Sequence, residues 1–178
     1  MNRNDECQEL GALLRARFPL ILIASCEEPR ILQVLQQAAN LDNQVLMTWS
    51  ITTGIRRYGR DEAIYQTNEL LDALKHIDKT QQNGVYVLCD AHPGFKDPVV
   101  MRLLREIALS HYRCARTIVL LSPRLDDLPS EILRQSAHFQ PRLPDRDDIR
   151  AIISEEARRY ESQSSEKPRS DRHAGADQ

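Results

Sequence analysis

Apolar residues along the chain form two kinds of pattern: short runs, and longer stretches in which they recur every three or four positions. The run PLILIA at 19–24 is typical of a strand that is covered on both faces in a parallel sheet. Further strands are predicted at 45–50, 84–89 and 117–121. Helices are predicted at 5–17, 29–40, 61–79 and, after Gly94, over a stretch from Val99 to Ile107. This alternation predicts a parallel α/β sheet with right-handed crossovers.

The segments between and after these elements are more polar. A loop with Gly54 and Gly59 follows the second predicted strand, and a turn-rich segment follows the fourth at 122–129. Beyond it we expect a short helix near 130–135, a short fifth strand near 138–140 and a closing helix at 146–160. Residues 161–178 contain no aliphatic side chain beyond alanine, so they bury too little surface to fold. The predicted organisation is one domain over residues 1–160 and a disordered polar tail over 161–178.

Composition and charge narrow the classes of function. The 178 residues are 41% hydrophobic and 28% charged, with 24 Lys and Arg against 26 Asp and Glu, which is typical of a soluble globular domain. Because the chain lacks a basic surplus, nucleic acid is not expected as a partner. The longest apolar run is far shorter than the roughly 20 residues that cross a bilayer. The N-terminus shows no apolar signal region, so we expect a cytoplasmic location and no membrane contact.

The cysteines give no sign of a metal centre. Cys7, Cys26, Cys89 and Cys114 stand far apart, without a C-x-x-C pair or a close histidine. This spacing predicts neither a zinc site nor a disulfide framework, so no bound metal is expected. Cys89 falls in a predicted strand and is expected to be a small core residue.

The loop after the first predicted strand bears directly on nucleotide binding, because ligands of parallel α/β sheets gather at the carboxyl ends of the strands. A phosphate-binding loop has the order G-x-x-x-x-G-K-[ST]. Here Ser25 to Arg30 read SCEEPR, with no glycine and no lysine. Glu27 and Glu28 would lie at the positive end of the following helix, where they repel a phosphate. The sheet is therefore expected to lack a Walker A loop, and no nucleotide cofactor is expected.

An alternative interpretation rests on the loops after the third and fourth predicted strands. The run Val85–Cys89 followed by Asp90 has the form that holds magnesium in P-loop NTPases. The next residues are Ala91 and His92, where a hydrolytic AAA enzyme needs a glutamate to polarise water. His92 is a candidate base, and Ser122 ends a strand where a polar residue senses a terminal phosphate in such folds. Under this alternative, ATP and magnesium bind weakly around Asp90, His92 and Ser122.

Exposed arginines are the candidates for contact with a partner. Arg134 lies in the short helix predicted near 130–135, and Arg56 and Arg57 lie in the loop that contains two glycines. Arg56, Arg57, Tyr58 and Arg60 also form a small basic cluster that fits a third, weaker interpretation as an RNA contact. Three arginines and one tyrosine fall short of a nucleic-acid footprint.

Four segments together resemble a known family: LLRARFPLILIASCEEPRIL, VLMTWSITTGI, VYVLCDAHPGFKDPVVMRLLREIA and RTIVLLSPRLDDLP. They look like the N-terminal region of the conserved AAA-type ATPases known from uncharacterised chloroplast and cyanobacterial reading frames and from other bacteria. The resemblance covers most of residues 8–158. The stretch from Leu128 through Arg134 to Asp145 also resembles the second half of an AAA+ core.

The resemblance implies a fold and a role. It implies an α/β, P-loop NTPase-like sheet of AAA+ type, flanked by helices and without a Walker A loop. In that family this region is degenerate, and an intact AAA domain with both Walker motifs follows it, so ATPase activity is implied for the family and not for these residues. The present sequence ends in a polar tail, and we expect a fragment, a truncated version or a stand-alone relative. The expected function is non-catalytic: regulating or scaffolding an AAA ATPase by contact with an intact AAA domain or a second copy.

Overall fold

The computed structural model describes residues 3–125, 128–142, 150, 153–154 and 157–158. The chain divides into two compact units, residues 1–141 and 142–178. In the second unit the described residues are Arg142, which lies outside any helix or strand, and the helical residues Arg150, Ile153, Ser154, Ala157 and Arg158. The closing helix predicted at 146–160 and the tail predicted at 161–178 lie largely outside the described residues. The domain boundary near residue 160 therefore stays a prediction.

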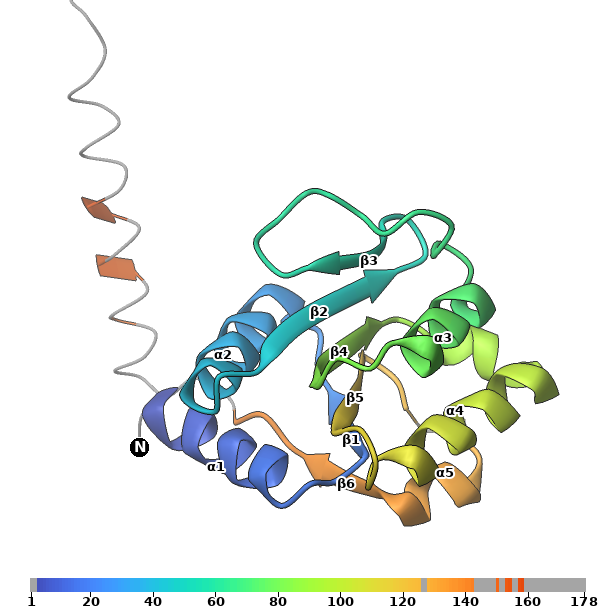
Figure 1. Ribbon diagram of the computed structural model, residues 1–178. Coiled ribbons are helices and arrows are strands. Elements are labelled where there is room, and N and C mark those ends of the chain that lie inside the picture. Colours follow the sequence, from blue (N-terminus) through green and yellow to red (C-terminus); the bar gives the residue numbers. More distant parts are fainter. Residues whose placement is uncertain (1–2, 126–127, 143–149, 151–152, 155–156, 159–178) are drawn as a thin grey trace, which may run out of the picture. The chain divides into compact units, whose positions relative to one another are not determined.

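The first unit alternates helices and strands as expected (Figure 1). The helical elements are α1 (Arg3–Arg15), α2 (Glu28–Leu41), α3 (Leu70–Lys79), the 3-10 helix η1 (His92–Lys96), α4 (Pro98–Ser110) and α5 (Ser130–Gln135). The strands are β1 (Leu20–Ala24), β2 (Val45–Ser50), β3 (Gly54–Arg57), β4 (Gly84–Cys89), β5 (Arg116–Ser122) and β6 (Ser136–Phe139). None of the described helices is both long and apolar enough to cross a membrane.

The strands form one sheet in the order β3-β2-β4-β5-β1-β6. All neighbouring pairs are parallel except β2 and β3, which run antiparallel. The predicted parallel α/β sheet is therefore confirmed, with one antiparallel edge strand that the sequence analysis placed in a loop. Because the other strands are parallel, the segments that follow β1, β4 and β5 meet at one edge of the sheet.

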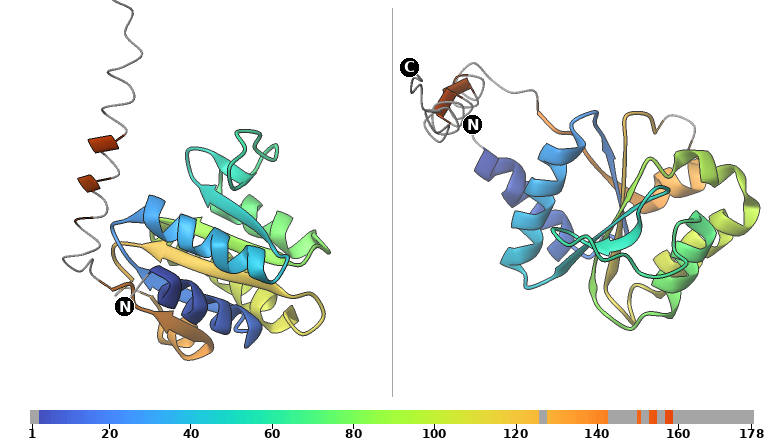
Figure 2. Two further views of the ribbon diagram at one scale, coloured as in Figure 1. Left: turned by 90° about the vertical axis from the view of Figure 1, so that its left-hand side faces the viewer. Right: turned by 90° about the horizontal axis from the view of Figure 1, so that it is seen from above.

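Helices cover both faces of the sheet (Figure 2): α1 and α2 lie on one face, and α3, α4 and α5 on the other. β1 shows how the sequence produces this arrangement, because successive side chains of a strand point to opposite faces. Leu20 and Leu22 join the core beneath α3 and α4, whereas Ile21 and Ile23 join the core beneath α1 and α2. Each fully buried Leu or Ile contributes about 1.5–3 kcal/mol relative to an exposed side chain.

Local signals mark the starts of α2 and α4. Proline stands in the first turn of α2 and of α4, where its missing N–H costs nothing. The side chain of Asp97 caps α4 by accepting a hydrogen bond from the backbone N–H of Val99 at 2.8 Å.

The strand predictions for 45–50 and 84–89 are confirmed at both ends. The short fifth strand predicted near 138–140 is confirmed as β6, which begins two residues earlier and ends one residue earlier.

The helix predicted at 61–79 is wrong in its first nine residues, because α3 begins only at Leu70. Thr67 explains the difference. Its hydroxyl accepts a hydrogen bond from the backbone N–H of Ile55 at 2.8 Å and donates one to the carbonyl of Ile64 at 2.7 Å. These contacts hold the segment against β3 in a non-helical conformation, and Gln66 has a positive φ of 58°. A tertiary contact therefore overrides the helical spacing of Ile64.

Candidate functional site

The loop after β1 shows what occupies the N-terminus of α2. The backbone N–H of Glu27 donates to the Oγ of Ser25 at 3.0 Å. Arg30 is held between carboxylates: its Nε donates to Glu27 at 2.9 Å and its Nη1 donates to Glu6 at 2.7 Å. The cation of this loop is thus committed to carboxylates of its own chain, and the exposed Glu28 side chain adds a further negative charge.

The residues of the alternative nucleotide site come together at the same edge of the sheet. Ser122, which is 2% exposed, lies at the end of β5, and its Oγ is 2.9 Å from Nδ1 of His92. Asp90 directly follows β4 and has a positive φ of 51°, and its backbone N–H donates to the carbonyl of Leu121 at 2.9 Å. The backbone N–H of Ser25 donates to the carbonyl of Ser122 at 3.1 Å. The loops after β1, β4 and β5 are therefore tied into one surface.

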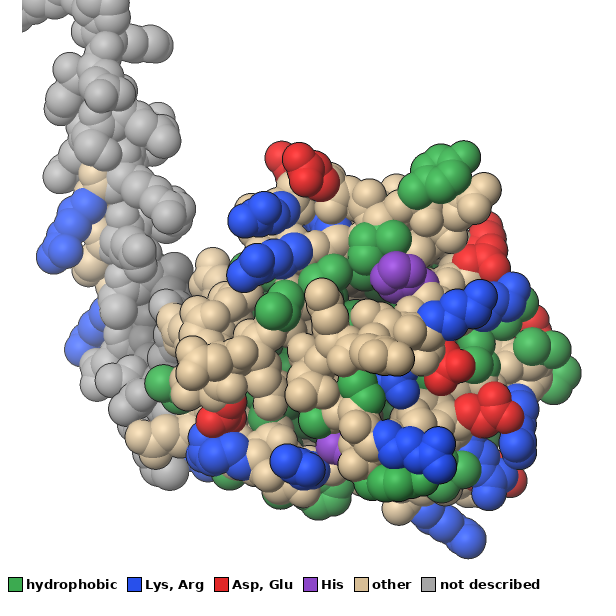
Figure 3. Space-filling model, in the orientation of Figure 1, with side chains coloured by type: hydrophobic (Ala, Val, Ile, Leu, Met, Phe, Trp, Pro, Cys, Tyr) green, Lys and Arg blue, Asp and Glu red, His purple; other side chains and the backbone are tan. Residues whose placement is uncertain are grey.

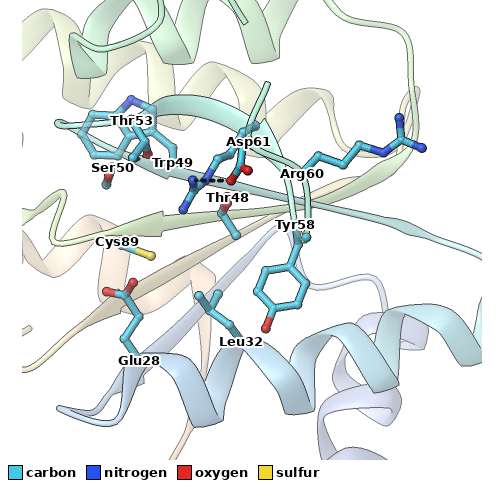
Figure 4. A pocket seen from close by; sticks show the side chains of 12 residues that line it. Glu28, Leu32, Thr48, Trp49, Ser50, Thr53, Tyr58, Arg60, Asp61 and Cys89 are labelled. Atoms are coloured by element: carbon cyan, nitrogen blue, oxygen red, sulfur yellow. Dashed lines mark hydrogen bonds and ion pairs between the residues drawn. The ribbon is translucent and has the colours of Figure 1, made fainter. Parts of the chain in front are cut away.

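The side chains of the basic cluster Arg56, Arg57, Tyr58 and Arg60 point in different directions. β3 includes Arg56 and Arg57, and neighbouring strand residues point to opposite faces. Arg56 lines a cavity on the α2 side together with Tyr58, whereas Arg57 is exposed and points the other way. Arg60 is exposed, and Figure 4 shows its side chain turned away from the other labelled residues. These residues do not form one continuous surface, which weighs against the RNA interpretation.

Side chains of both charges are mixed on the protein surface as well. Figure 3 shows Lys and Arg side chains interspersed with Asp and Glu side chains on the face seen in Figure 1. No continuous basic band is visible on that face. A mixed surface of this kind lacks the one-sided positive field that draws a protein to nucleic acid.

Arg134 lies apart from Arg56. It is exposed on α5, which packs on the α3 and α4 side of the sheet, whereas Arg56 faces α2. Within the described residues Arg134 forms no ion pair or hydrogen bond, while its neighbour Glu131 pairs with Arg105 at 3.2 Å. The structure therefore leaves the Arg134 guanidinium open to solvent and does not join the predicted partner contacts into one site.

A cavity that the sequence analysis missed lies between the start of α2 and the β2–β3 hairpin (Figure 4). Its volume is about 140 Å³. The lining residues are Glu28, Leu32, Thr48, Trp49, Ser50, Thr53, Arg56, Tyr58, Gly59, Arg60, Asp61 and Cys89. It was missed because β3 was read as a loop. The signal was the short stretch Ile55 to Tyr58 between two glycines, which places alternate side chains on opposite faces.

Cys89 forms part of the floor of this cavity and is 5% exposed, as expected of a core residue. Burial, followed by the nearby carboxylates of Glu28 and Asp90, raises the pKa of the Cys89 thiol to about 12. The thiol is therefore protonated at neutral pH and is a poor nucleophile. Among the described residues, no group of three or more His, Cys, Asp or Glu side chains is arranged to hold a metal ion.

Comparison with known sequences identifies the family. Residues 6–140 match the family model described as SpoVK-like AAA ATPase, N-terminal domain. The chain is 34% identical over 121 residues to a protein of Guillardia theta named uncharacterized AAA domain-containing protein ycf46, covering 66% of this chain and 24% of the relative. A protein of the same name from Trieres chinensis is 26% identical over 153 residues, covering 84% of this chain and 30% of the relative. The chain thus spans less than a third of the length of these relatives.

The chain also superposes on chains of solved structures. A chain of the HORMA:CdnC:Trip13 complex of E. coli MS115-1 superposes with a TM-score of 0.49 at 12% identity, over 80% of this chain and 59% of that chain. C. elegans PCH-2 gives a TM-score of 0.49 at 12% identity, over 80% of this chain and 43% of that chain. The expected fold class, an AAA+-type sheet flanked by helices and without a Walker A loop, is confirmed. From the match over residues 6–140, the chain belongs to the family of SpoVK-like AAA ATPase N-terminal domains.

Proposed function

We propose that this domain is a non-catalytic AAA-type module that regulates or scaffolds an AAA ATPase by contact with it. The observation that carries the proposal is the loop from Ser25 to Arg30. At the edge of the sheet where a phosphate would bind, it offers carboxylates in place of glycine N–H groups and a lysine.

Electrostatics argue against a phosphate at the start of α2. Each of Glu27 and Glu28 would repel a phosphate charge 4 Å away by about 1 kcal/mol in water, and more where water is excluded. The one cation of the loop, Arg30, already donates hydrogen bonds to the carboxylates of Glu27 and Glu6. Turning it toward a phosphate would leave the 8% exposed Glu6 side chain without that partner.

Titration calorimetry with ATP and magnesium tests this part of the proposal. We expect no binding tighter than about 100 μM, which corresponds to roughly −5.5 kcal/mol. The second candidate function, weak ATP binding around Asp90, is favoured by the hydrogen bond between His92 and Ser122. Tighter binding that Asp90→Ala abolishes would support that candidate and overturn the non-catalytic one. The matched control is Asp78→Ala, at the far end of α3.

The partner that we propose is an intact AAA domain, either on another chain or on a further part of a longer chain, with a second copy of this domain as the alternative. The relatives support a larger assembly, because this chain spans only 24% and 30% of the length of the two described above. Arg134 is the proposed contact, since its exposed guanidinium has no partner among the described residues. Such a charge contributes little in water and more when it meets a partner carboxylate.

Capture of an AAA ATPase by the tagged chain, followed by light scattering, tests the contact. We expect an AAA ATPase of the same cell among the captured proteins, or a concentration-dependent dimer. Arg134→Ala is expected to weaken that association, whereas Arg102→Ala, which removes an exposed arginine paired with Glu106 on α4, should leave it unchanged. A strictly monomeric chain that captures no ATPase contradicts the docking role. Unchanged capture by Arg134→Ala removes this residue from the contact.

A further inference from the structure

Asn83 and Gly84 form the one Asn-Gly pair in the sequence, and the pair lies where β4 begins. The structure explains why a glycine stands at residue 84. A Cβ at this position would lie 2.9 Å from the carbonyl oxygen of Val45, on the neighbouring strand β2. The two strands approach each other this closely only where residue 84 has no side chain. Strand packing therefore requires a glycine directly after Asn83.

An Asn-Gly pair has a reaction of its own, which needs only water and hydroxide. Hydroxide removes the proton from the backbone nitrogen of the glycine, and this nitrogen attacks Cγ of the asparagine. The new C–N bond closes an imide ring, while the side-chain nitrogen takes up a proton from water and leaves as ammonia. Water then opens the ring at either carbonyl and gives aspartate or isoaspartate. Glycine favours the attack because it has no Cβ beside the nitrogen and its backbone turns freely.

The fold holds both reacting groups through one residue, Ala115, which directly precedes β5. The backbone N–H of Ala115 donates to Oδ1 of Asn83 at 3.0 Å, and Sγ of Cys114 donates to the same oxygen at 3.5 Å. The backbone N–H of Gly84 donates to the carbonyl of Ala115 at 3.1 Å. The attacking nitrogen thus keeps its proton in a hydrogen bond, and the amide that it would attack is held by its oxygen.

We propose that Asn83 is a deamidation site gated by Ala115: the reaction proceeds only when the start of β4 separates from this residue. The Asn83 side chain is exposed, so its contacts with Ala115 protect it where burial does not. Isoaspartate inserts one extra carbon into the main chain before Gly84, which pairs with Arg116. The modification therefore displaces Gly84 from its partner strand and makes the opening permanent. This inference is independent of the proposed docking function.

The test incubates the full chain at pH 8, folded in buffer and unfolded in guanidinium chloride. Mass spectrometry of peptides follows the gain of about 1 Da at Asn83. Hydrogen exchange, followed by NMR, measures how strongly the folded chain protects the Gly84 N–H, the same group that attacks. We expect Asn83 to react at least about tenfold more slowly in the folded chain, and this ratio to match the protection of the Gly84 amide within about threefold.

Two variants test the role of Ala115. Ala115→Pro removes the N–H that holds Asn83 and keeps the carbonyl that holds Gly84, whereas Ala115→Ser keeps both groups. We expect the folded proline variant to deamidate at least about threefold faster than the folded wild type, and the serine variant to follow the wild type. Asn40 and Asn68, which precede Leu41 and Glu69, are internal controls and should stay unmodified.

Three results would overturn the proposal: equal rates in the folded and unfolded chains, no reaction at Asn83 in the unfolded chain, or equal rates in the two folded variants. If Ala115→Pro does not fold, the comparison with Gly84 exchange in the wild type decides. A folded-state rate that is unrelated to the protection of that amide contradicts gating by Ala115.

Discussion

Arg30 of α2 and Glu6 of α1 are joined by a 2.7 Å ion pair whose side chains are only 20% and 8% exposed. This contact links the N-terminal helix to the loop that replaces a phosphate-binding loop. We predict that Glu6→Ala lowers the free energy of unfolding by about 1.5–3 kcal/mol, the range for hydrogen bonds to charged groups. Urea unfolding at pH 7 measures the change.

The control for this prediction is Glu9→Ala, which removes an exposed carboxylate from the same helix. We expect it to change the free energy of unfolding by less than about 0.5 kcal/mol. If both variants unfold at the same urea concentration, the ion pair between Glu6 and Arg30 does not stabilise the packing of α1 on α2.

The parts of the fold that were predictable from sequence have a local cause. β2 and β4 were predicted to the residue because polar or turn-forming residues bound their apolar stretches. β3 was not predictable in the same way, since two of its four residues are arginines and its position depends on other segments. Gly54 has a φ of +67°, and a Cβ at this position would lie 2.8 Å from the Thr67 hydroxyl. This close approach of Gly54 to Thr67 exists only in the folded chain.

The candidate site was likewise predictable only in part. The rule that strand ends meet at one edge of a parallel sheet placed Asp90, His92 and Ser122 in neighbouring loops. It did not give the hydrogen bond between His92 and Ser122, which depends on how η1 turns after β4. The cavity that Thr48 lines was out of reach because it requires β3, and therefore the contact with Thr67.

The buried side chain of Arg116 caps the C-terminal end of α3. This 4% exposed side chain donates from Nη1 to the carbonyls of Ile77 and Asp78, each at 2.6 Å, and from Nη2 to the hydroxyl of Ser110 at 2.7 Å. Helix carbonyls at this end lack backbone partners and carry the negative end of the helix dipole. We predict that Arg116→Ala lowers the free energy of unfolding by about 1.5–3 kcal/mol, the range for hydrogen bonds to charged groups.

Arg116→Lys tests whether charge alone is sufficient. A lysine keeps the positive charge but loses the fork of N–H donors that reaches two elements at once. We expect it to recover less than half of the stability lost in Arg116→Ala, measured by thermal and urea unfolding. Full recovery would show that the geometry of the guanidinium is unimportant here.

Cys26 and Cys89 are expected to differ sharply in reactivity. Cys26 is exposed in the loop between β1 and α2. Cys89 is buried, and its pKa is raised to about 12 by burial and by the carboxylates of Glu28 and Asp90. At pH 8 the folded state should hold on the order of a thousandfold less Cys89 thiolate than an unfolded chain, where the pKa is about 8.5. We therefore predict that iodoacetamide labels Cys26 in the native protein and reaches Cys89 only after unfolding, as read by mass spectrometry of peptides. Prompt labelling of Cys89 would mean that the cavity opens wide enough to hydrate its thiol.

His111 is expected to make stability depend on pH. Its side chain is 7% exposed, and its Nε2 is 3.4 Å from the hydroxyl of Thr117. Burial lowers the pKa of His111, and the neighbouring charges of Arg17 and Arg116 lower it further. The folded state therefore holds this histidine neutral more strongly than the unfolded state does.

The sign of the effect follows from this difference in pKa. An unfolded histidine takes up a proton near pH 6.5, so below that pH the unfolded state binds more protons and the folded state loses stability. The stabilising contribution is complete above about pH 6.5 and is lost as the pH falls toward the folded pKa. We predict that, between pH 7.5 and pH 5.5, the wild type loses more free energy of unfolding than His111→Gln does. His138→Gln, which alters an exposed histidine on β6, should follow the wild type. Equal losses in the wild type and in His111→Gln would show that the protonation of His111 is not linked to folding.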